Sequence, residues 1–260
     1  MEHISELSSM AERSDTLSRR QKGLRSPLTL GLVSCGAIGA FLFTVTYLLE
    51  GITRPGYDAR TQPISALSLG PGGWVQQVNF IVFGILLVLS AAGWYRLLTP
   101  GRATIWFPLI QGMNGLCLIG AGVFSMDPFP GYPPGTTLTS STVHGTLHSA
   151  LAWVLITTLA LGCFAFAQYV RKLLHWHGWF VYSLITGILI LIFWEAFVQG
   201  AERAVAGLVP LVGLTERLSA GSHALWICLL VVTLFLKKGA SAESLPCAVN
   251  LIQPIEDDLM

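Results

Sequence analysis

Two histidines one helical turn apart, His144 and His148, have the spacing in this chain that most directly suggests chemistry. Side chains at positions i and i+4 lie on one face of a helix, which is how a helix commonly offers two nitrogen ligands to one metal ion. The pair stands at the start of an apolar segment. Ionisable groups are costly in a bilayer and usually mark function or a specific structural need.

Other ionisable residues fall near the same end of the apolar segments as this pair. Asp127 ends one segment, and Glu216 and His223 stand seven residues apart at the start of the last one. Residues seven apart share a helix face. We therefore expect one polar pocket near one boundary of the membrane. Its predicted members are Asp127, His144, His148, Glu195, Glu202, Glu216 and His223.

Two or three histidines with a carboxylate match a catalytic zinc site, in which one coordination position stays open. Zinc would lower the pKa of a bound water to about 7 and polarise an ester or amide carbonyl. Glu216 would act as the general base, and Ser65 and Ser68 would hydrogen-bond the substrate or the oxyanion. The predicted ligands are His144, His148, His223 and Asp127, the last as a fourth ligand or an orienting group.

The same residues fit other roles. His144 could be solvated at a helix start while His148 bonds a carbonyl across a helix interface, and haem between His148 and His223 is a further alternative. Glu195 reads as the most buried carboxylate, either a ligand or an ion-pair partner. The hypotheses are a metal-dependent hydrolase of a lipid or amphiphile, a non-enzymatic binder or transporter of a lipid or small molecule, and a structural subunit.

Composition decides the class of protein. Of the 260 residues, 53% are hydrophobic and only 11% are charged, whereas a soluble domain carries about a quarter charged residues. This indicates a polytopic helical membrane protein in contact with lipids. The net charge of +1 does not indicate a nucleic-acid partner. No disulfide framework is expected, because four of the five cysteines fall inside apolar segments.

Six apolar segments approach the roughly 20 residues that a membrane-spanning helix needs. Their predicted ranges are 27–50, 74–97, 104–125, 143–170, 178–200 and 214–236. The predicted fold is an all-α bundle of six transmembrane helices (27–236), between an N-terminal arm (1–26) and a C-terminal tail (237–260). Small residues in the third segment predict close helix packing. These are Gly112, Gly115, Gly120 and Gly122.

Lysine and arginine set the predicted orientation. They are concentrated in the arm, in the short links after the second and fourth segments, and at the start of the tail. The positive-inside rule therefore places both termini in the cytoplasm, which makes this a multi-pass protein of the cytoplasmic membrane. The links at 51–73 and 126–142 would lie outside. Both are long and rich in Pro and Gly, so they are candidate lids over the pocket. The sequence does not indicate an oligomeric state.

Four blocks of sequence, RPGYD (54–58), ISALSLG (64–70), DPFPGYPPG (127–135) and HGTLH (144–148), resemble the bacterial and archaeal membrane family called domain of unknown function 998. The similar region runs over about residues 28–236. The resemblance implies a multi-helix membrane fold. A looser similarity of residue types links the chain to intramembrane hydrolases such as alkaline ceramidases. The family blocks point to Tyr57, Asp58, Ser65, Ser68, Asp127, His144 and His148.

Overall fold

The computed structural model describes residues 26–98, 105–136, 141–171 and 176–243. Six long helices account for most of them, and the short 3-10 helix η1 (Ile64–Ser68) lies between the first two. The predicted all-helical fold is confirmed. The long helices are α2 (Pro27–Thr53), α3 (Trp74–Leu97), α4 (Trp106–Val123), α5 (Val143–Tyr169), α6 (His177–Val205) and α7 (Val212–Glu243).

All six helices are long and apolar enough to cross a membrane, so the predicted spans are confirmed. α6 continues to Val205 and α7 to Glu243, beyond the predicted ends at residues 200 and 236. A helix satisfies its own backbone hydrogen bonds, so it can continue past the apolar stretch that defines a span. Residues 1–25 and 244–260 lie outside the described residues, and the cytoplasmic location of the termini stays a prediction.

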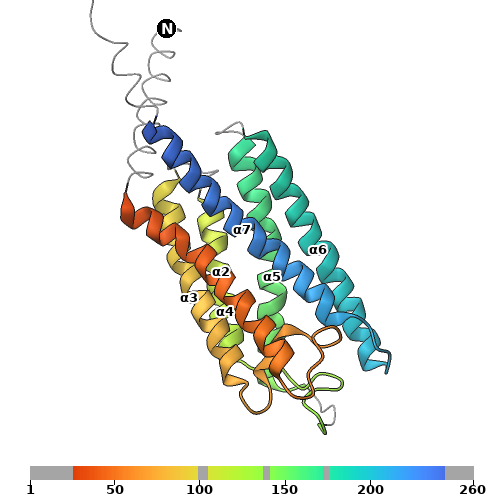
Figure 1. Cartoon of the computed structure of the whole chain (residues 1–260). Coiled ribbons are helices and arrows are strands. Elements are labelled where there is room, and N and C mark those ends of the chain that lie inside the picture. Colours follow the sequence, from red (N-terminus) through yellow and green to blue (C-terminus); the bar gives the residue numbers. More distant parts are fainter. Residues whose placement is uncertain (1–25, 99–104, 137–140, 172–175, 244–260) are drawn as a thin grey trace, which may run out of the picture.

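The helices form a closed ring. Each one packs against its neighbours in the sequence, and α7 packs against both α6 and α2. The start of α2 and the end of α7 lie at the same end of the bundle (Figure 1), as an even number of crossings requires. We call this the terminus end. The opposite end, with the segments 54–73, 124–136, 141–142 and 206–211, is called the loop end.

α3 and α4 pack closely against each other. A Cβ atom added to Gly115 would lie 2.6 Å from the carbonyl oxygen of Gly84, and one added to Gly84 would lie 2.5 Å from the carbonyl oxygen of Gly115. The two backbones are therefore in direct contact, as small residues permit in membrane helices. Close packing is confirmed at Gly115, whereas a Cβ atom on Gly112 would meet only the Cβ atom of Ala91, at 3.8 Å.

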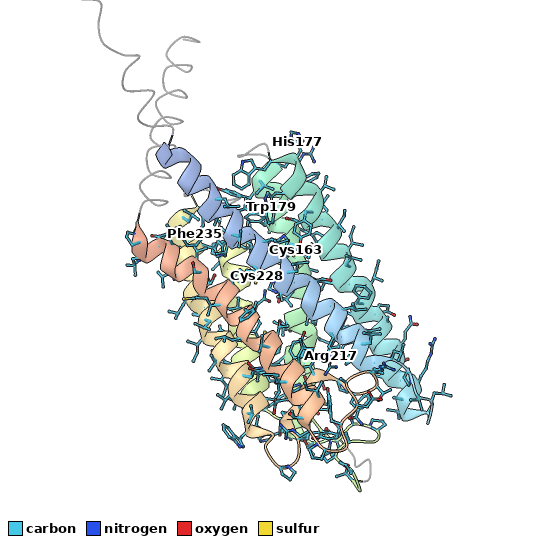
Figure 2. The ribbon with its side chains drawn as sticks, in the orientation of Figure 1. Cys163, His177, Trp179, Arg217, Cys228 and Phe235 are labelled. Carbon is cyan, nitrogen blue, oxygen red and sulfur yellow. The ribbon has the colours of Figure 1, made fainter. Side chains whose placement is uncertain are left out.

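Four large aromatic side chains fill the interior of the ring toward the terminus end. The ring centroids of Trp94 and Phe107 are 5.2 Å apart, and those of Phe166 and Trp226 are 5.4 Å apart. Each of the four is at most 2% exposed. We call these residues the aromatic plug. Trp179 contacts Phe166, and Figure 2 shows Trp179 in the half of the bundle opposite Arg217, which lies near the loop end.

Candidate functional site

A cavity lies inside the ring, between the aromatic plug and the loop end, and the empty space there, open solvent included, is about 760 Å³. Apolar side chains from α2 to α7 form most of its wall, and we call it the inner chamber. Four polar residues interrupt this apolar lining, namely Ser65, His148, Glu216 and His223. An apolar cavity with a few polar groups is the usual form of a small-molecule site.

A second cavity, which we call the vestibule, adjoins the inner chamber at the loop end, and its empty space, open solvent included, is about 820 Å³. Residues of α5, α6, α7 and both long loops line it, among them Met126, Trp153, Phe197 and Glu202. The loops thus contribute to the wall of the pocket, as the lid prediction requires. The residues that line both cavities are Ser65, His148, Ala152, Trp194 and Glu216, so the polar groups mark the junction.

His148 is held in one orientation by the end of α4. Its Nδ1 atom lies 2.7 Å from the carbonyl oxygen of Phe124 and 3.1 Å from that of Ala121. Because a carbonyl oxygen only accepts, Nδ1 must carry the proton, and in the neutral ring Nε2 is then the acceptor. The bond also satisfies carbonyl groups that have no partner at the end of a helix. The predicted bond from His148 to a carbonyl across a helix interface is confirmed.

Glu216 joins α7 to the first long loop. Its carboxylate accepts a hydrogen bond of 2.5 Å from the backbone N–H of Ile64, at the start of η1. This bond places the half-buried carboxylate at the junction of the two cavities. Ser65, the next residue of η1, lines both cavities as well. The predicted base and one predicted serine are thus brought to the same pocket as His148.

Arg217 holds the same loop down. Its guanidinium group donates to the Tyr57 hydroxyl at 2.7 Å and to the carbonyl oxygen of Gln62 at 3.2 Å. It also lies over the rings of Tyr47 and Tyr57, at 5.6 and 5.7 Å from their centroids. Burial raises the pKa of Tyr57, although Arg217 opposes the shift. The protonated Tyr57 hydroxyl donates in turn to the carbonyl oxygen of Pro63, so Tyr57 has a structural role.

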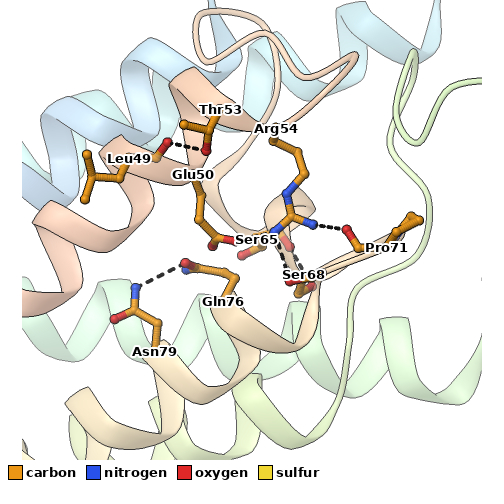
Figure 3. A network of polar contacts seen from close by, with 10 residues as sticks. Leu49, Glu50, Thr53, Arg54, Ser65, Ser68, Pro71, Gln76 and Asn79 are labelled. Carbon is orange, nitrogen blue, oxygen red and sulfur yellow. Dashed lines mark hydrogen bonds and ion pairs between the residues drawn. The ribbon is translucent and has the colours of Figure 1, made fainter.

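A second group of polar contacts fixes the two ends of this loop (Figure 3). Arg54 forms an ion pair with Glu50, one turn earlier in α2, and also donates to the carbonyl oxygens of Pro71 and Gly72, the latter at 3.0 Å. Ser68 donates to the carbonyl oxygen of Ser65 at 2.7 Å. Ser68 therefore closes the turn of η1 and is not among the residues that line either cavity.

Asp127 caps the start of α5. Its carboxylate accepts from the backbone N–H of Thr142 at 3.0 Å and from the Thr142 hydroxyl at 2.6 Å. Burial acts to raise the pKa of Asp127, but the hydrogen bonds from Thr142 and Ser141 outweigh it and lower that pKa below its usual value. A Cβ atom on Gly145 would collide with this carboxylate. The DPFPGYPPG and HGTLH blocks thus meet in a structural contact.

His144 does not join the other histidines. It is exposed in the first turn of α5, with its ring edge-on to Phe124 at 5.5 Å. His223, by contrast, is only 4% exposed and lines the inner chamber. It contacts the Trp226 ring, and no hydrogen bond joins it to another described residue.

The predicted zinc ligands are therefore divided between places. His148 and His223 line the inner chamber, whereas Asp127 binds Thr142 and His144 lies at the surface. Within the described ranges, no group of three or more His, Cys, Asp or Glu residues could hold a metal ion. Zinc and haem therefore stay predictions from the sequence, because the described residues do not bring the predicted ligands together.

One prediction about α6 is wrong, and one feature shared by α5 and α6 was not predicted. Glu195 is not the most buried carboxylate but is exposed, and it accepts a hydrogen bond of 2.9 Å from Gln199. The aromatic wall of the vestibule was not predicted. It is formed by Trp153 on α5 with Trp194 and Phe197 on α6. The available signal was that these two tryptophans stand inside apolar segments, away from the ends where an aromatic belt lies.

Six membrane-spanning helices around a pocket near one end define a multi-pass helical membrane protein. A family profile described as "Protein of unknown function (DUF998)" matches residues 37–233. The chain therefore belongs to this family, and the resemblance seen in the four sequence blocks is confirmed. No functionally curated protein matches the chain, and no solved structure does.

Proposed function

We propose that this protein binds one amphiphile from the membrane, with its polar group at the junction of the two cavities and its apolar chain in the inner chamber. The observation that supports this most is the division of one pocket into an apolar interior and a polar junction formed by Ser65, His148 and Glu216. The mostly apolar lining of the inner chamber, with a few polar groups, is also typical of ligand pockets.

The position of the vestibule supports entry from the lipid phase. α5 and α6 lie together at the terminus end and diverge toward the loop end in Figure 1. The vestibule is lined by both helices at the loop end, and Trp153 in its wall is also 49% exposed. A membrane amphiphile can therefore reach the junction without crossing the long loops. With the predicted orientation, it would come from the outer leaflet of the cytoplasmic membrane.

Filling the junction is expected to remove the ligand. Ala152 lines both cavities, so Ala152→Trp should occupy the space through which an apolar chain passes. We expect native mass spectrometry of the full chain, released from lipid nanodiscs, to show at least about tenfold less retained amphiphile. Ala150→Trp is the matched control, because Ala150 is on the same helix but exposed. Equal retention by both variants would contradict the proposal.

Hydrolysis of the bound amphiphile is a second candidate function, and the orientation of His148 favours it. Because Nδ1–H is held by the end of α4, Nε2 is available as a general base. Nε2 would take a proton from water as the water oxygen attacks an ester or amide carbonyl. The bond to the alcohol or amine then breaks, and His148 returns the proton to that leaving group. Ser65 stands at the same junction to hydrogen-bond the substrate.

This candidate predicts a loss of activity that is specific to His148. With the full chain in nanodiscs and 4-nitrophenyl laurate as the probe, we expect His148→Gln to lower the hydrolysis rate about a hundredfold. His144→Gln should leave the rate unchanged, because His144 lies at the surface. Zinc content, measured on the same samples, tests the metal-dependent form, for which only His148 and His223 of the predicted ligands line the chamber wall. The absence of hydrolysis in the wild-type protein would leave binding alone.

A further inference from the structure

The vestibule has an aromatic wall in addition to its polar junction. The ring centroids of Trp153 and Trp194 are 5.3 Å apart in an edge-to-face arrangement, and those of Trp194 and Phe197 are 4.7 Å apart and stacked. All three side chains line the vestibule. The faces of aromatic rings carry negative potential and attract cations, ammonium groups among them.

The charged side chains that line the vestibule beside this wall are both acidic. Glu202 and Glu216 line the vestibule, and no lysine or arginine is among its described lining residues. Arg217 follows Glu216 in the chain, but its guanidinium group is turned to Tyr57 and Gln62 of the first loop. An anionic headgroup would meet two carboxylates without a compensating base. A cation would be attracted to both, and more strongly to the half-buried Glu216 than to the exposed Glu202.

A buried donor in the same wall has no partner. Trp194 is 8% exposed, and its indole N–H makes no hydrogen bond in the described structure. Leaving a buried donor unpaired costs about 1–3 kcal/mol. The nitrogen itself is covered by neighbouring atoms, so an acceptor atom of a ligand could reach it only after those atoms move.

We propose that the vestibule binds a positively charged ammonium group, so that the ligand of this pocket is a cationic amphiphile. Its ammonium group would lie among Trp153, Trp194 and Phe197, with Glu202 and Glu216 as counter-charges, and its chain would enter the inner chamber. This inference rests on the proposed binding of an amphiphile and adds the chemical class of the headgroup. Protonated long-chain amines and alkyl quaternary ammonium compounds belong to this class.

The test compares three single-chain probes that share a dodecyl chain, namely dodecyltrimethylammonium, dodecyl sulfate and dodecyl maltoside. The full chain is placed in nanodiscs of neutral lipid, each probe is added at the same mole fraction, and occupancy is measured by native mass spectrometry. We expect occupancy by the trimethylammonium probe to exceed that by the sulfate at least about tenfold, with the maltoside between them.

Two glutamates of one helix provide the matched variants. Glu202→Gln removes a carboxylate of the vestibule, whereas Glu195→Gln makes the same change at a position that does not line it. We expect Glu202→Gln to reduce occupancy by the cationic probe about fivefold and Glu195→Gln to leave it within about twofold. Both variants remove one negative charge, so a change in the non-specific attraction of the probe to the protein is the same in both and cancels when the two are compared.

The outcomes distinguish this inference from the proposed function. Equal occupancy by all three probes, with loss in Ala152→Trp, would overturn the cationic preference and leave amphiphile binding in place. Equal effects of the two glutamine variants would also overturn it. If no probe binds, both proposals fail. Trp153→Leu gives a second measurement, since it should weaken binding of the ammonium probe while leaving that of the maltoside unchanged.

Discussion

Replacing Gly115 by alanine is expected to lower the free energy of unfolding by about 3 kcal/mol. The new methyl group would lie 2.6 Å from the carbonyl oxygen of Gly84 and 3.0 Å from the backbone nitrogen of Val88. These neighbours are backbone atoms, which cannot move aside as a flexible side chain can. α3 and α4 would have to separate along their contact. Equilibrium unfolding of the purified protein in mixed detergent micelles, followed by tryptophan fluorescence, measures the change.

Gly112→Ala is the control for this result. Gly112 is on the same helix, one turn earlier, and an added Cβ atom would meet only Ala91, at 3.8 Å, an ordinary contact. The same substitution should therefore change the unfolding free energy by less than about 1 kcal/mol. Because alanine favours a helix more than glycine does, a similar loss in both variants would mean that the contact of Gly115 with Gly84 is not the cause.

Replacing Arg217 by methionine is expected to release the first long loop. Arg217 donates to Tyr57, to Gln62 and to the carbonyl oxygen of Gly213, and methionine keeps the length of the side chain without the donors. Loss of hydrogen bonds to a charged group costs about 1.5–3 kcal/mol each. We expect tryptic cleavage after the exposed Arg60 to become about a hundredfold faster, because cleavage follows the population of the opened loop.

Arg203→Met provides the comparison for the loop. Arg203 is exposed near the end of α6, and no side-chain contact joins it to the described part of the first loop. Its removal should leave cleavage after Arg60 at the wild-type rate. If Arg217→Met also cleaves at the wild-type rate, then Glu216 and the Arg54 contacts are sufficient to hold the loop, and Arg217 is not its anchor.

The fold was largely predictable because the bilayer imposes a length and an apolar composition on every crossing. The segments 74–97 and 143–170 agree with α3 and α5 within a residue. The rotation of each helix about its own axis, and so the face that points inward, was harder to predict from the sequence. On α5, Leu147, Val154 and Leu161 are exposed apolar side chains while Leu159 is buried, so the apolar pattern does not distinguish the inner face from the lipid face.

The candidate site was predicted only in part, because residue spacing gives the face of a helix but not the direction in which that face points. His148, Glu216, His223 and Ser65 share one pocket, because helix phase and chain direction bring them to one level of the bundle. Asp127 and His144 were assigned to that pocket, but both belong to the start of α5, where a local cap and solvent satisfy them. Sequence spacing shows that residues share a face, and it does not show whether their turn lies inside the bundle.

The aromatic plug determines how a ligand must travel. Toward the terminus end, the pocket is closed by the packed rings of Trp94, Phe107, Phe166 and Trp226. A ligand that enters by the vestibule, as proposed, would meet these packed side chains and would leave through the same opening. Ligands would then exchange one at a time, and dissociation of the bound ligand would limit the rate of exchange.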